Sequence, residues 1–161
     1  DIDAIVHAFG LAALRAREAG YDGVELHAAH AYTLSSFLSR RNPRKGRYGG
    51  GTLEGRLTMF GEVMAEVRRR VGADFPVGVR FLAEEAIKGG YALPEAQQIA
   101  LRMAQWGVDY ISLSVGGKFE DAIHRPGQMM RIVGDDPDRL ALDSRQRRHD
   151  AEAKLATNFQ S

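Results

Sequence analysis

The stretch GYDGVELHAAHAY, residues 20–32, decides the fold of this chain. Upstream of it, apolar side chains recur at helical spacing, and Gly20 can adopt the left-handed conformation that ends a helix. Residues 23–27 then form a short, largely apolar run that predicts a β-strand. Two histidines and a tyrosine follow at once. A helix that leads into a strand with polar groups at its end is typical of α/β proteins.

The same alternation of helix and strand continues along the chain. Helices are predicted over 33–38, 53–71 and 93–106, and strands over 76–81 and 108–114. This order predicts a parallel sheet with right-handed crossovers. Three parallel strands cannot close a barrel, and a (β/α)8 barrel needs about 250 residues. The sequence therefore predicts an α/β fold that is a segment of something larger.

The composition of the chain excludes several classes of function and of site. The chain has 161 residues, 22 Lys and Arg against 21 Asp and Glu, and no cysteine. The near-zero charge argues against a dedicated nucleic-acid or membrane-surface binder. Without cysteine, disulfides, cysteine-ligated metals and thiol nucleophiles are excluded within the chain. No apolar run is long enough to span a bilayer, and the first residues lack a signal-peptide pattern, so a cytoplasmic protein is expected.

Each predicted strand ends in polar side chains: His27, His30 and Tyr32 after the first, Arg80 in the second, and Ser112 and Ser114 in the third. Because the carboxyl ends of parallel strands meet at one edge of a sheet, we expect these side chains to converge. The histidines are compatible with a metal site that still needs a third ligand, with a structural turn, or with hydrogen bonds to a substrate oxygen.

Three further features of the sequence leave alternatives open. Tyr32 is either a proton donor or an aromatic packed at the rim. Arg80 either faces an electron-rich ligand or forms a salt bridge with Glu84 or Glu85. The basic residues between 40 and 47 are compatible with phosphate or RNA binding, although a solvated loop is the more common explanation. Nucleotide-binding fingerprints with their glycine spacing are absent.

Several ordered motifs resemble the old yellow enzyme family of FMN-dependent NADH:flavin oxidoreductases, or ene-reductases. They lie at residues 20–32, 37–39, 42–44, 48–50, 53–56, 75–80, 107–112 and 116–122. The chain departs from the family pattern at Gly46, where an acid is usual, and at Gly55, where Asn is usual. It also carries one extra residue within 49–52.

The resemblance implies a partial (β/α)8 TIM barrel comprising about strands four to six with their helices. It implies that His27 and His30 bind the activating oxygen of the substrate, that Tyr32 donates the proton, and that Arg80 contacts FMN. The implied reaction is the NAD(P)H-driven reduction of an activated alkene. No metal is expected.

The resemblance covers residues 1–128 and assigns 129–161 to a divergent tail, which we expect to be mobile. Because the other barrel strands are missing from the chain, we expect the isolated chain to be inactive. The alternative is a non-catalytic, truncated remnant that acts at most as an interaction module. Its partners would be a small-molecule alkene and, through open strand edges, further copies of the chain, with no nucleic acid or membrane.

Overall fold

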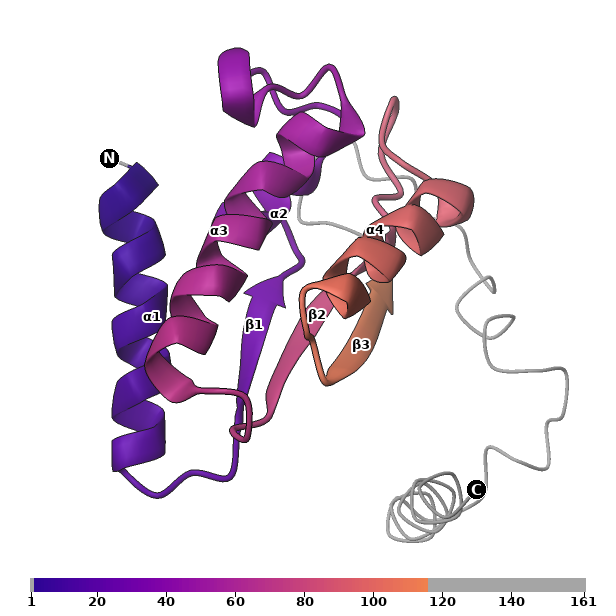
Figure 1. The fold of residues 1–161 in the computed structure, drawn as a ribbon. Coiled ribbons are helices and arrows are strands. Elements are labelled where there is room, and N and C mark those ends of the chain that lie inside the picture. Colours follow the sequence, from indigo (N-terminus) through magenta and orange to yellow (C-terminus); the bar gives the residue numbers. More distant parts are fainter. Residues whose placement is uncertain (1, 116–161) are drawn as a thin grey trace, which may run out of the picture. The chain divides into compact units, whose positions relative to one another are not determined.

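The computed structural model describes residues 2–115 of the chain. Its elements are α1 (Ile2–Glu18), β1 (Val24–Ala28), α2 (Thr33–Leu38), the 3-10 helix η1 (Gly46–Tyr48), α3 (Leu53–Val71), β2 (Val77–Glu84), α4 (Leu93–Gln105) and β3 (Tyr110–Val115) (Figure 1). The predicted alternation of helix and strand is confirmed. The predicted boundary near residue 128 and the tail beyond it lie outside the described residues.

The three strands form one parallel sheet in the order β1, β2, β3. Val24 pairs with Val77 at the start of β1, and His27 pairs with Arg80 near its end. On the other side of β2, Arg80 pairs with Ser112. The register therefore places one polar residue from each strand in a single row across the sheet.

Buried apolar side chains from the sheet and the helices form one core, and α1 lies against α3 (Figure 1). Its members include Leu26, Val79 and Phe81 from the strands, Phe60, Val63, Met64 and Val67 from α3, and Ile99 and Met103 from α4. The apolar stripe of each helix is what the sequence periodicity predicts for a helix that covers a sheet. This core holds the strands rigidly beneath the loops that follow them.

The other face of the sheet carries polar side chains. In β1, Glu25 and His27 alternate with the buried residues Leu26 and Ala28. Because successive side chains of a strand point to opposite faces, the two polar residues point away from the core. Arg80 pairs with His27 and shares its face. These polar side chains therefore lie on the face of the sheet that the helices leave uncovered.

The loops at the amino end of the sheet are joined by Arg68, which lies near the end of α3. Its guanidinium donates to the carbonyl oxygens of Phe75 at 2.7 Å and Gly107 at 2.6 Å, and it pairs with Asp109. Asp109 also accepts a hydrogen bond from the backbone N–H of Val77 at 2.7 Å. Burial alone would raise the pKa of Asp109, but the hydrogen bonds from Val77 and Arg68 outweigh it and lower that pKa. These contacts fix where β2 and β3 begin.

Candidate active site

His27, His30 and Tyr32 come together at the carboxyl end of β1. The ring of His27 lies between the other two, with its centroid 5.3 Å from that of His30 and 5.3 Å from that of Tyr32. The Tyr32 side chain is not packed away, because the residue is 50% exposed. Two imidazoles and a phenol therefore stand at one strand end, where a small molecule can reach them.

A strained turn produces this grouping. His30 has φ 55° and Ala31 has φ 61°, so two consecutive residues other than glycine adopt the left-handed conformation. This conformation costs a residue with a Cβ about 1–2 kcal/mol. The turn is closed by a hydrogen bond from the N–H of Tyr32 to the carbonyl of Ala29 at 3.3 Å. Strain of this kind gathers at functional sites, and nothing in the sequence of this stretch signals it.

Arg80 lies beside His27 in the neighbouring strand, and its Nε donates to Oε1 of Glu25 at 2.8 Å. Arg80 therefore forms its salt bridge with a residue of the neighbouring strand β1. The prediction that Glu85 is its partner is wrong. The buried Glu85 carboxylate instead accepts backbone N–H groups of Arg40 at 3.1 Å and Tyr91 at 2.9 Å. The Arg80 side chain remains 43% exposed on the open face of the sheet.

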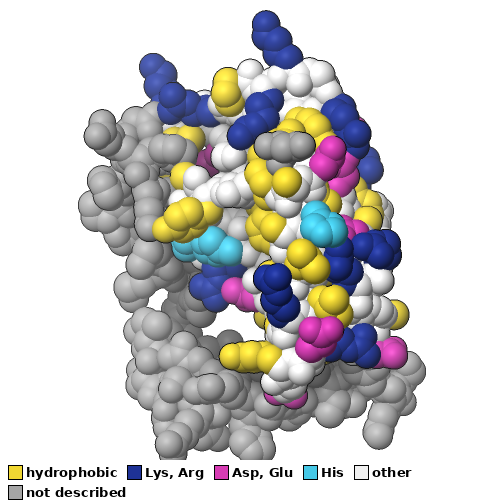
Figure 2. Space-filling model, turned by 90° about the vertical axis from the view of Figure 1, so that its left-hand side faces the viewer, with side chains coloured by type: hydrophobic (Ala, Val, Ile, Leu, Met, Phe, Trp, Pro, Cys, Tyr) yellow, Lys and Arg dark blue, Asp and Glu magenta, His cyan; other side chains and the backbone are white. Residues whose placement is uncertain are grey.

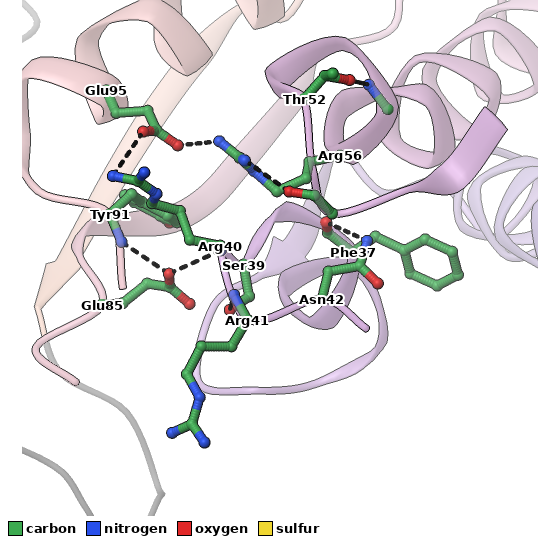
Figure 3. A network of polar contacts seen from close by, with 12 residues as sticks. Phe37, Ser39, Arg40, Arg41, Asn42, Thr52, Arg56, Glu85, Tyr91 and Glu95 are labelled. Carbon is green, nitrogen blue, oxygen red and sulfur yellow. Dashed lines mark hydrogen bonds and ion pairs between the residues drawn. The ribbon is translucent and has the colours of Figure 1, made fainter. Parts of the chain in front are cut away.

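A polar network ties the loop after α2 to the loop after β2 (Figure 3). The buried Arg56 donates to the carbonyl of Gly50 at 3.0 Å and pairs with Glu95, which also pairs with Arg40 at 3.7 Å. Tyr91 is buried and donates through its hydroxyl to a backbone carbonyl. Burial, reinforced by the charges of Glu85 and Glu95, raises the pKa of this phenol. The network joins these loops, and the roles of Arg56, Tyr91 and Glu95 in it could not be predicted from the sequence.

Several motif residues of the same loop serve its architecture. The buried amide of Asn42 donates to the carbonyls of Phe37 at 3.1 Å and Tyr48 at 2.9 Å, and its oxygen accepts from the N–H of Arg44 at 3.1 Å. The Arg44 guanidinium lies 3.7 Å from the centre of the Phe37 ring, and Arg47 pairs with a carboxylate of α3. Basic side chains gather at the carboxyl-end loops, at the top of Figure 2, yet these two are engaged within the loop region.

Gly46 and Gly55 fit the backbone of this loop. A Cβ at Gly55 would lie 2.4 Å from the carbonyl oxygen of Gly49, so no side chain can stand there without moving the loop. Gly46 has φ 70°, a conformation that an acidic residue would adopt only with strain.

Two kinds of feature are absent from the part of the chain that the structure describes. Within residues 2–115, no three His, Asp or Glu side chains are grouped so that they could hold a metal ion. Over the same range, none of the helices combines the length and the apolar character needed to cross a membrane.

The family is established by comparison with known proteins. A model of the NADH:flavin oxidoreductase / NADH oxidase family matches residues 1–131. The chain belongs to this family, whose cofactors are FMN and NAD(P)H.

Individual relatives agree with this assignment. An NADH oxidase of Thermoanaerobacter brockii is 38% identical over 116 residues, which are 72% of this chain and 18% of that protein. A 2-naphthoyl-CoA reductase solved with 2-naphthoyl-CoA is 29% identical, with a TM-score of 0.70 over 81% of this chain and 21% of that one. An old yellow enzyme homologue from Zymomonas mobilis, 24% identical, has the same fold, with a TM-score of 0.62 over 78% of this chain and 36% of that one. The chain spans 18% to 36% of the length of these proteins.

The fold prediction is therefore confirmed: the chain is part of a (β/α)8 barrel, and the polar face of its sheet corresponds to the barrel interior. The side chains present fit a flavin and a carbonyl-bearing ligand. Arg80 offers a guanidinium on the open face, and His27, His30 and Tyr32 offer hydrogen-bond donors nearby. The phosphate of FMN requires fixed donors of its own, which the resemblance assigns to strands seven and eight.

Proposed function

We propose that this chain supplies the substrate-binding and proton-donating part of an FMN-dependent ene-reductase that reduces activated alkenes with NAD(P)H. The observation that carries the proposal is that the ring of His27 lies 5.3 Å from the rings of both His30 and Tyr32, while His27 pairs with Arg80 of the neighbouring strand. The chemistry that FMN supplies when bound is hydride transfer, received from NAD(P)H and delivered to the β-carbon of the alkene.

His27 and His30 bind the oxygen that activates the alkene. As hydride reaches the β-carbon, negative charge develops on this oxygen, and two imidazole N–H groups stabilise it. Their rings are tilted by 48° to each other, so they approach a common acceptor from different directions. The pair therefore polarises the double bond without a metal ion.

Tyr32 completes the addition by donating its phenolic proton to the α-carbon. One hydride and one proton are then added across the double bond, and NAD(P)H is oxidised. The side chain is half exposed, so water can return the proton after each turnover. General acid catalysis of this kind contributes about 10²–10⁴-fold to the rate.

Arg80 contacts the flavin ring, where its positive charge favours the reduced, electron-rich form. The isolated 161-residue chain is proposed to lack tight FMN binding and turnover, because a single guanidinium contributes about 1–3 kcal/mol whereas micromolar affinity needs about 8 kcal/mol. Self-association through open strand edges and a cytoplasmic location stay predictions.

The test separates the two half-reactions in an FMN-loaded barrel that contains this segment. Tyr32→Phe is expected to slow alkene reduction by about 10²–10⁴-fold while flavin reduction by NAD(P)H keeps its rate, as stopped-flow absorbance of the flavin will show. Tyr21→Phe is the matched control, because Tyr21 is 68% exposed and precedes β1 at the opposite end of the sheet. Equal slowing of both half-reactions would refute the role of Tyr32.

A further inference from the structure

Below the candidate site, side chains from all three strands meet on the open face of the sheet. Glu25, Gly78 and Tyr110 occupy one row of the register, and His27 and Arg80 occupy the next row toward the carboxyl end. The Nε of Arg80 reaches back across this step to Oε1 of Glu25 at 2.8 Å. The guanidinium is thus attached to the sheet one row below the histidine that it accompanies.

Tyr110 lies in the same row as Glu25, across Gly78. Its ring lies directly over Gly78, since a Cβ at that position would come within 2.1 Å of the ring. Burial raises the pKa of the Tyr110 phenol, and the charge of Glu25 together with their hydrogen bond raises it further. The phenol is therefore placed beside the carboxylate that accepts from Arg80.

We propose that Glu25 is a positioning residue for Arg80, with Tyr110 fixing Glu25 in turn. This inference rests on the proposed function, in which Arg80 meets the flavin ring. An arginine side chain has many rotamers, and a carboxylate on its Nε selects one of them while its terminal nitrogens remain available to a ligand. Within residues 2–115, this guanidinium is paired with Glu25.

The position of Arg80 is measured first, in the 161-residue chain without FMN. Its Nε–H signal in ¹H–¹⁵N spectra is assigned by its loss in Arg80→Lys. Arg70, whose side chain is 12% exposed, donates through Nε to Glu66 and acts as the internal reference for a carboxylate-bound signal. In the unsubstituted chain the Arg80 signal is expected to be shifted downfield and to exchange slowly with water, as the reference does.

Glu25→Gln is expected to abolish this shift and protection, and Tyr110→Phe to reduce them. Asp22→Asn, an exposed acid just before the same strand, is the control and is expected to leave the signal in place. An Arg80 signal unchanged by Glu25→Gln would overturn the proposal, whatever the activity of the protein.

The consequence for the flavin is measured as its midpoint potential in an FMN-loaded barrel that contains the segment. Glu25→Gln releases the guanidinium whose place at the ring favours the reduced form, so the potential is expected to fall. The same substitution in an Arg80→Met background is expected to have little effect. A shift of equal size in both backgrounds would show that Glu25 acts by its own charge, and the positioning role would be wrong. If Arg80→Met alone leaves the potential unchanged, the contact of Arg80 with flavin fails instead, while the spectra still decide the Glu25 pairing.

Discussion

At the amino end of the sheet, Arg68 gives its guanidinium to two loop carbonyls and to Asp109, whereas at the carboxyl end His27, His30 and Tyr32 gather half exposed around a strained turn. The polar groups around Arg68 form hydrogen bonds and an ion pair with one another, and these contacts hold the loops together. The second set of polar groups lies at the strand end and is partly exposed, which is where the proposed function places the substrate. In a barrel of this class the amino end is expected to serve stability and the carboxyl end chemistry.

The largest effect on stability is expected at the amino end. Arg68→Met should lower the free energy of unfolding by about 2–3 kcal/mol, because it removes the guanidinium from Asp109 and from the carbonyls of Gly72, Phe75 and Gly107. Urea unfolding followed by circular dichroism measures this change. Arg102→Met in α4 is the control: its side chain is 48% exposed, its pair with Glu54 is 3.9 Å long, and a change within about 0.5 kcal/mol is expected. Equal losses in both variants would show that the contacts of Arg68 contribute no more to stability than a surface salt bridge does.

A smaller effect of opposite sign is expected at the carboxyl end. Ala31→Gly should raise the free energy of unfolding by about 1 kcal/mol, because glycine adopts φ 61° without strain. Ala29→Gly is the matched control: this buried residue does not have a positive φ, and its loss should destabilise the protein by about 1 kcal/mol. Thermal unfolding separates the two variants. A destabilised Ala31→Gly would show that the turn stores no strain.

The smallest expected effect is on the pH dependence of stability. It concerns Glu66 of α3, away from both ends of the sheet. Hydrogen bonds from Arg69 and then Arg70 lower the pKa of Glu66 from 4.5 to about 2. Because the pKa is lower in the folded protein, this stabilisation is present above pH 4.5 and is lost as the pH falls toward 2. Glu66→Gln should therefore flatten the dependence of unfolding free energy on pH in that window. A slope unchanged by Glu66→Gln would assign it to other carboxylates, among them Asp109.

Much of the fold could be predicted from the sequence because the apolar periodicity of each segment directly reflects the face that it buries. The grouping of His27, His30 and Tyr32 could be predicted from their place after a strand. The partner of Arg80 could not, because Glu25 reaches it only through the register of two strands 55 residues apart. The strained turn was also hidden, because an alanine at position 31 gives no sign of a positive φ where a glycine would have done so.

The central claim is that the amino end of the sheet serves stability and the carboxyl end serves ligand binding. The variant His30→Ala tests it most directly, with ligand affinity and stability measured on the same protein. In an FMN-loaded barrel that contains this segment, affinity for a phenol or enone ligand is expected to fall at least about tenfold, because one hydrogen bond to its oxygen is lost. The free energy of unfolding is expected to stay within about 0.5 kcal/mol, since alanine keeps the Cβ and therefore the strain of the positive φ at this position. Unchanged ligand affinity together with a marked loss of stability would contradict the account and make His30 a structural residue of the turn.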